Sequence, residues 1–156
     1  MDSELKQHSA DLIGKKRYRL FDEVHDPIGK RKLTVHPDIL FVMKAELPSG
    51  KDLKRLFLVE VDKGTEGLRV IADKLTAYHL YRREGIFKKF GAFNEFKVLF
   101  QTTSMKRAQN LAKIAHDFGD VLDIWVTDQN QVAPSSVLKE AIWLRPENDQ
   151  PQALLK

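Results

Sequence analysis

The sequence predicts a single α/β domain with a mixed β-sheet. Its 156 residues suit one domain, and 42% of them are hydrophobic, which is enough to form a buried core. Apolar runs of strand length and segments with helical periodicity follow one another in the order helix, strands, helix, strand, helix, strand. Two of the strands are joined only by a turn and should therefore pair antiparallel. This order of elements is typical of a layered α/β domain.

The elements in the first part of the chain follow from caps, alternation and turns. A short helix is predicted over residues 3–13, and a strand over residues 17–23. The run Asp26-Pro27-Ile28-Gly29 is a turn signal. A clear strand is predicted over residues 35–47, and another over residues 54–62, with a turn near residue 50 between them.

The second part of the chain alternates helices and strands. Apolar residues recur at helical spacing from Gly64 to about Arg83 and predict a long helix, for which Gly85 supplies a stop. A strand is expected over residues 96–101, and Thr103 or Ser104 caps a helix that runs to about residue 118. A further strand is expected over residues 121–127.

The domain is expected to comprise residues 1–145. A polar turn follows the last predicted strand at residues 128–131. Residues 146–156 are rich in Pro, Gln, Asn and Asp, and are predicted to form a flexible C-terminal tail.

The composition excludes several classes of protein. There is no cysteine, so disulfides and thiolate zinc sites are excluded, which fits a reducing compartment. No apolar run approaches the roughly 20 residues that span a bilayer. The first residues are acidic and polar, unlike a secretion signal. We therefore expect a cytoplasmic protein that has no membrane partner and lacks a glycine loop for phosphates, a Ser-His-Asp set and a dinucleotide fingerprint.

The positive charge of the chain is modest but clustered. The formal net charge is +4 and the sequence pI is about 9.2, which alone supports nucleic-acid binding only weakly. Basic clusters at the predicted ends of elements can form a rim that faces phosphates, or they can be ordinary solvated surface. The candidate DNA-binding residues are Lys30, Arg31, Lys32, Lys88, Lys89, Lys106 and Arg107.

The run Phe87-Lys88-Lys89-Phe90, with Phe93 behind it, mixes aromatic and cationic side chains. Such a mixture can stack on exposed bases while holding phosphates. It can equally close over an edge of the core, and the frequency with which Phe is buried favours this second interpretation.

Three carboxylates are expected to meet in space. Asp38 lies near the start of one strand and Glu60 near the end of the next, so antiparallel pairing brings them together. Asp62 follows Glu60 by two residues and shares its face. Three carboxylates repel one another unless a cation neutralises them, and oxygen ligands select Mg²⁺ or Mn²⁺. Such an ion makes water a better nucleophile and stabilises negative charge on a phosphate.

These motifs resemble the PD-(D/E)XK nuclease superfamily, and more narrowly the replication-relaxation family encoded on plasmids and other mobile elements. The likeness covers residues 17–127 and depends on three motifs. These are His36-Pro37-Asp38-Ile39-Leu40, the run from Phe57 to Glu66 (FLVEVDKGTE), and Lys74-Leu75 with Tyr78. The resemblance implies a restriction-endonuclease-like mixed central sheet flanked by helices, a role in plasmid replication or transfer, and DNA as partner. Many relatives in the superfamily work as dimers, so a homodimer is one assembly to expect.

The chain departs from the superfamily signature at one position. The signature has a lysine two residues after the acidic strand residue, where this chain has Asp62. Lys74 on the following helix flanks the buried stripe, so its long stem can reach over the sheet and supply the cation instead. Alternatively, Asp62 is a third metal ligand and no lysine is used. A third alternative is that the site has decayed and the fold only binds DNA.

The hypothesis that follows is a DNA endonuclease-like domain that depends on Mg²⁺ or Mn²⁺. Asp38, Glu60 and Asp62 would hold the ion, and Lys74 would position water and screen phosphate charge. Tyr78 and Gln101 are candidate supporting residues. The alternative is a catalytically inactive DNA-binding or replication-accessory domain that retains the nuclease fold. A third interpretation is a module that recruits other replication proteins.

Overall fold

The computed structural model describes residues 20–155. The helix predicted over residues 3–13, and the part of the next strand that covers residues 17–19, lie outside these residues. Within them, a β-hairpin is followed by a six-stranded mixed sheet and two α-helices, which confirms the predicted mixed α/β architecture.

The central sheet has the strand order β3-β4-β5-β6-β7-β8. Its strands are β3 (Ile39–Glu46), β4 (Asp52–Val61), β5 (Lys97–Thr102), β6 (Asp123–Asp128), β7 (Trp143–Arg145) and β8 (Asn148–Gln152). The first two pair antiparallel, as predicted, and β4, β5 and β6 run parallel to one another. The last two strands are antiparallel to their neighbours.

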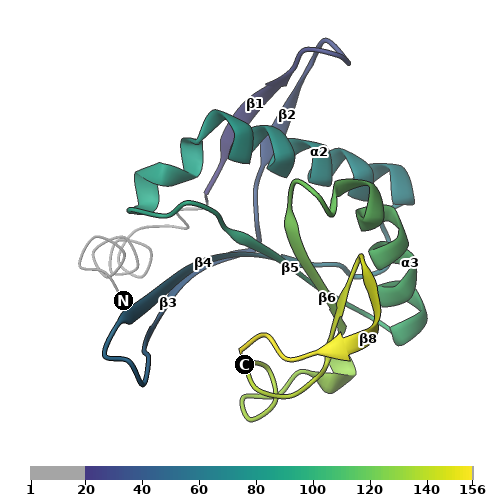
Figure 1. Cartoon of the computed structure of the whole chain (residues 1–156). Helices are drawn as coiled ribbons and strands as arrows, with labels where there is room; N and C mark the ends of the chain where they lie inside the picture. The colour runs from purple at the N-terminus through teal and green to yellow at the C-terminus, as the bar shows by residue number, and fades with distance from the viewer. Residues whose placement is uncertain (1–19, 156) are drawn as a thin grey trace, which may run out of the picture.

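Helices α2 (Leu68–Glu84) and α3 (Met105–Ala115) cover one face of this sheet (Figure 1). Each helix connects two parallel strands, which cannot be joined by a tight turn. The larger hydrophobic core lies between the helices and the sheet and includes Leu75, Leu111 and Phe100. Ser104 caps α3 by accepting a hydrogen bond from Arg107 N at 3.1 Å, one of the two caps that were predicted.

A second, smaller core lies on the opposite face of the sheet. It joins side chains of the parallel strands to the segments that precede β7 and follow β8; its buried members are Phe57, Leu99, Trp125, Ile142, Trp143 and Leu154. The C-terminal residues therefore depart from the loose tail that was predicted, because β8 pairs with β7 and Leu154 is buried. Their polar composition hid Leu154, the buried residue that anchors them.

The N-terminal hairpin of β1 (Asp22–Asp26) and β2 (Arg31–Val35) forms a separate two-stranded sheet beside α2 (Figure 1). The turn between its strands was predicted, but the strand predicted over residues 35–47 is interrupted. The chain leaves β2 at Val35 and enters β3 only at Ile39. Pro37 lies in this gap, and because proline has no N–H to donate, a continuous paired strand is disfavoured there.

The start of α2 lies further along the chain than predicted. The helix was expected to open at Gly64, but Gly64 has φ +76° and α2 begins at Leu68, with Gly67 as N-cap. A left-handed residue cannot continue into a right-handed helix, so the chain turns before α2 begins. In the described residues 20–155, no helix is both long and apolar enough to cross a membrane.

Candidate functional site

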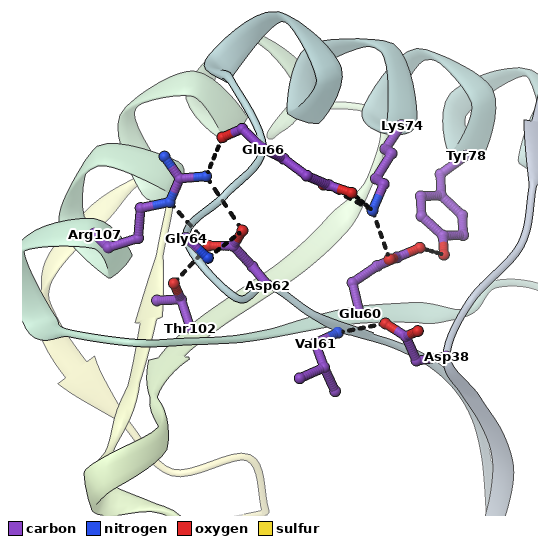
Figure 2. A network of polar contacts seen from close by, with 10 residues as sticks. All are labelled: Asp38, Glu60, Val61, Asp62, Gly64, Glu66, Lys74, Tyr78, Thr102 and Arg107. Atoms are coloured by element: carbon purple, nitrogen blue, oxygen red, sulfur yellow. Dashed lines mark hydrogen bonds and ion pairs between the residues drawn. The ribbon is translucent and has the colours of Figure 1, made fainter.

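Antiparallel pairing of β3 and β4 brings Asp38 beside the end of β4, as predicted. Ile39 pairs with Val59, and the preceding residue, Asp38, donates its N–H to Val59 O at 2.9 Å. Val61 N in turn donates a hydrogen bond to Asp38 Oδ2 at 2.7 Å (Figure 2). The carboxylate of Asp38, an exposed residue, is thus held at the edge of the sheet where β4 ends.

Glu60 lies next to this position, on the face that α2 covers. It is only 3% exposed, and two residues of α2 bind its carboxylate (Figure 2). The hydroxyl of Tyr78 donates to Oε1 at 2.5 Å, and Lys74 Nζ lies 3.2 Å from Oε2. Lys74 and Tyr78 are four residues apart, so the helix presents both to the same point on the sheet.

The electrostatics of this group follow from its burial. Burial raises the pKa of the Glu60 carboxyl, the Tyr78 and Lys74 contacts oppose that rise, and the charge of Asp38 adds to it. Burial lowers the pKa of the Lys74 ammonium, but Glu60 and Glu66 outweigh burial, so the pKa of Lys74 is raised. The result is a cation that stays charged at neutral pH beside a largely buried carboxylate.

Lys74 also links the start of α2 to this group. Its Nζ donates to Glu66 Oε1 at 3.1 Å in addition to Glu60. The lysine therefore bridges two carboxylates, as expected of a cation drawn back over the sheet from the flank of the buried stripe. This is the position that the relocated-lysine alternative requires, one of the three raised by the missing signature lysine.

Asp62 shares the face of Glu60 but has a different environment. It is 5% exposed and accepts hydrogen bonds from Arg107 Nε and Thr102 Oγ1 on Oδ2, and from Arg107 Nη2 and Gly64 N on Oδ1 (Figure 2). Burial acts to raise the pKa of Asp62, but these bonds outweigh it and the pKa is lowered. An ionised carboxylate offers about four acceptor positions, so those of Asp62 are all used within the protein.

The number of acceptor positions still available differs among the three carboxylates that were predicted as metal ligands. Glu60 accepts from Tyr78 and Lys74, and Asp38 from Val61, so each retains acceptor positions that these bonds do not use. Within residues 20–155, no group of three or more His, Cys, Asp or Glu side chains is arranged to hold a metal ion. Asp38 and Glu60 are thus the two carboxylates with acceptor positions left for a further ligand, whereas the positions of Asp62 are taken by Arg107, Thr102 and Gly64.

Gln101 does not lie where it was expected. Phe100 pairs with Glu60 and Gln101 with Val61, so the Gln101 side chain points to the face of the sheet opposite Glu60. Thr102, the next residue, is on the same face as Asp62 and is the one that contacts it, at 2.6 Å. The alternation of side chains along a strand would have identified Thr102 once the register was known.

The predicted DNA-binding residues separate into two groups. Arg31 pairs with Asp73 and Asp26, Lys32 with Glu23, and Lys89 with Asp22, while Arg107 holds Asp62 and also donates to Glu66 O. Lys30, Lys88 and Lys106 are exposed, and in the described part of the chain no ion pair engages them. Lys30, Lys88 and Lys106 therefore remain the better candidates for contact with phosphates.

The aromatic residues of the 87–93 segment close over the core. Phe87, Phe90 and Phe93 are 1%, 8% and 6% exposed, and Phe87 packs edge-to-face on Phe96. Buried rings cannot stack on nucleic-acid bases, so the second of the two interpretations of this segment is confirmed.

Comparison with known proteins identifies one family at this site. The family model described as replication-relaxation matches residues 8–95 of the chain. This match includes Asp38, Glu60, Lys74 and Tyr78, and it ends before β5 and α3, so it does not reach Thr102 or Arg107. No curated protein and no solved structure matches the chain.

Proposed function

Because the chain belongs to the replication-relaxation family, we propose that it acts on DNA as a metal-dependent nuclease of the PD-(D/E)XK kind. The family name ties the chain to replication and relaxation, and hydrolysis of a phosphodiester bond is a direct way to relax or process a DNA molecule. The proposal includes a role on plasmids or other mobile elements, where DNA and other replication or transfer proteins are its partners.

The observation that carries this proposal is the position of Lys74. The nuclease signature needs a cation next to the acidic residue of the strand, and the chain has Asp62 at the usual place. Lys74 Nζ, 3.2 Å from Glu60 and kept charged by its surroundings, supplies that cation from α2 instead. Tyr78 fixes the other oxygen of Glu60 and so orients the carboxylate.

A divalent ion fits the remaining carboxylate positions. Mg²⁺ is commonly bound through one or two protein carboxylates, with water and substrate phosphate completing its coordination, and Asp38 and Glu60 are such a pair. When bound, the ion would make water more nucleophilic and stabilise charge on the phosphate. Mn²⁺ prefers the same oxygen ligands.

The protein's own groups would do the rest. Hydrolysis joins the oxygen of water to phosphorus and breaks the bond to a sugar oxygen, while a proton passes from the water to that leaving oxygen. Lys74 would donate a hydrogen bond to the phosphate and offset its charge. Asp38, which the hydrogen bond from Val61 N holds at the edge of the sheet, would hold the ion on the exposed side, where the substrate approaches.

Plasmid nicking in Mg²⁺ or Mn²⁺ tests the proposal, beside calorimetric titration of Mn²⁺. Glu60→Gln and Asp38→Asn should abolish metal binding, and Lys74→Gln should lower the nicking rate by about 10²–10³-fold, the usual cost of removing one donor that stabilises charge in the transition state. Glu46→Gln and Lys44→Gln, at exposed positions of β3 remote from Glu60, are matched controls and should leave both readouts unchanged.

One observation favours a second candidate function. Both oxygens of Glu60 already have partners inside the protein, as expected of a site that has become structural. In that case the chain is a DNA-binding or replication-accessory domain that retains the nuclease fold. Wild-type protein that binds DNA but neither binds Mn²⁺ nor nicks plasmid would establish this alternative and overturn the nuclease.

A further inference from the structure

A pocket with a strongly basic lining lies at the end of α2 from which the chain leads to β5. Its volume is about 280 Å³. The residues that line it come from the last turns of α2, the 3₁₀ turn that follows, and the loops before β5 and β6; they are His79, Arg82, Arg83, Phe87, Lys88, Asn94 and Val121.

The backbone at Gly85 builds this pocket. Gly85 ends α2 in the left-handed conformation, at φ +71°, and its N–H donates to Arg82 O. The chain then turns into η1 (Ile86–Phe90), where Lys88 N donates to Gly85 O at 3.1 Å. The Lys88 stem passes over Gly85, since a Cβ on that glycine would lie 3.7 Å from Lys88 Cδ. Phe87, 1% exposed, anchors this turn to the core.

The lining residues carry three positive charges and no negative charge. Arg82, Arg83 and Lys88 are the cations, and none of them forms an ion pair with any residue in the range 20–155. Arg82 Nη1 donates a hydrogen bond to Val121 O. A guanidinium has several N–H groups, so this bond uses only part of the donor capacity of Arg82. An anion that enters this site therefore meets several positive charges at once, which favours its binding.

The positive charges of these residues also affect His79, which lines the same pocket. Burial lowers the pKa of His79, and the charges of Arg83 and Arg82 lower it further. The acids nearest in the sequence, Glu84, Glu95 and Asp120, do not line the pocket. The C-terminal end of α2 contributes roughly half a negative charge, which is too little to offset three cations.

A second pocket provides a comparison, because a positive charge in its lining is paired within the protein. It is larger, at about 470 Å³, and includes Lys113, His116 and Arg145. Arg145 Nη2, however, lies 3.1 Å from Asp123 and 2.9 Å from Glu147, so its charge is met within the protein. Only the pocket at the end of α2 combines several cations with a lining free of such pairs, among the pockets described.

We propose that the pocket at the end of α2 binds a phosphate group, held by Arg83, Lys88 and Arg82 with help from the Asn94 amide. A volume of about 280 Å³ is at the lower end of small-molecule sites, which suits one phosphate with its water better than a whole nucleotide. A phosphodiester of a nucleic-acid strand and a free phosphate share this chemistry. Lys74 and Arg82 are about 12 Å apart along α2, so this site is separate from the carboxylates and does not rest on the proposed nuclease.

The first test is an NMR pH titration of the histidine rings in the full chain, with inorganic phosphate or with sodium chloride at equal ionic strength. Bound phosphate should raise the pKa of His79, because an anion favours the imidazolium. His116, in the wall of the other pocket, is an internal control and should titrate alike in both solutions. A His79 titration that phosphate leaves unchanged would overturn the proposal.

Matched variants identify the groups responsible. Arg83→Gln/Lys88→Gln should weaken phosphate binding at least about tenfold, since hydrogen bonds between charged groups are among the stronger ones. Lys44→Gln/Lys51→Gln removes the same charge from exposed positions of the β3–β4 hairpin and should leave binding unchanged. Equal phosphate affinity in the two double variants would contradict the assignment of these residues. Amide spectra of each variant verify the fold.

A short DNA oligonucleotide distinguishes the two sources of phosphate. If a strand phosphate occupies the pocket, Arg83→Gln/Lys88→Gln should lower oligonucleotide affinity and reduce the slope of log affinity against log salt by roughly one. The control double variant measures the part due to net charge alone. If the variant loses inorganic phosphate but binds the oligonucleotide as the control does, the ligand is a free phosphate or phosphomonoester.

Discussion

Two carboxylates that are two residues apart at the end of one strand have different roles in this protein. Glu60 lies in β4 and Asp62 directly after it, on the same face of the sheet, and both are almost fully buried. Glu60 meets a lysine and a tyrosine from α2 and retains acceptor positions, whereas Asp62 meets Arg107 of α3 and retains none. Their hydrogen-bond partners, not their positions in the sequence, make one a candidate ligand and the other a structural anchor.

Replacing Asp62 should destabilise the protein at neutral pH and less so in acid. Asp62→Asn leaves the Arg107 charge without its partner, which in a buried pair costs about 3–5 kcal/mol. Because the pKa of Asp62 is lowered below its ordinary value of 3.8 on folding, this stabilisation is present above that value and is lost as the pH falls through the folded pKa. Urea unfolding at pH 7 and near pH 3, followed by the buried Trp125 and Trp143, measures the difference.

The control for this substitution is Asp52→Asn, at the exposed first residue of β4. It should change the free energy of unfolding by less than about 0.5 kcal/mol, as expected at a surface position. If Asp62→Asn destabilises the protein equally at both pH values, the stabilisation by Asp62 does not depend on its ionisation.

At the scale of elements, the turn between β4 and α2 decides where the site residues lie. This turn carries Asp62 and Glu66, which contact Arg107 and Lys74, and Gly64, whose N–H donates to Asp62 Oδ1. Gly64 adopts φ +76°, and a Cβ there would lie 3.1 Å from Thr103 Oγ1. The turn is therefore packed against the start of α3 at the point where the chain reverses.

Gly64→Ala should lower the free energy of unfolding by about 1–2 kcal/mol, the cost of a left-handed conformation for a residue with a Cβ. The close Thr103 hydroxyl adds to this cost. Gly67→Ala is the matched control in the same turn, because Gly67 has φ −67° and an added Cβ meets nothing within 4 Å. Thermal and urea unfolding of the two variants give the comparison, and equal stabilities would contradict the role assigned to Gly64.

At the scale of the whole molecule, two cores hold the sheet from its two faces. The helices pack on one face, and the segments around β7 and β8 pack on the other, where Leu154 joins Phe57 and Trp125. Lys97 and Arg145 lie over the Trp125 ring and both pair with Asp123, which closes the edge of this second core. The C-terminal residues are thus part of the domain's packing.

Leu154→Ala should cost about 2–5 kcal/mol in the free energy of unfolding, because it removes a buried leucine side chain from the second core. Leu155→Ala is the control, since Leu155 is only partly buried and should cost less. Urea unfolding of both variants measures the difference. Similar losses from the two substitutions would mean that Leu154 is not the residue that anchors the C-terminal segment.

Local rules applied to the sequence were enough to predict several elements and one strand pairing. Hydrophobic periodicity identified both helices and the main strands of the parallel region, and a short turn implied that β3 and β4 pair antiparallel. That pairing was enough to bring Asp38 close to the end of β4. Helical spacing placed Lys74 at the edge of the buried stripe of α2, from which it reaches Glu60.

The partner of each buried polar group, by contrast, depends on how distant parts of the chain pack together. Asp62 and Arg107 are 45 residues apart, and their contact depends on how α3 packs beside β4. The side of the sheet that Gln101 faces, and the burial of Leu154 in a polar segment, likewise depend on register and on packing between distant elements. Local sequence rules describe neighbours along the chain, whereas the accounting of buried charges and hydrogen bonds is complete only when the whole chain is folded.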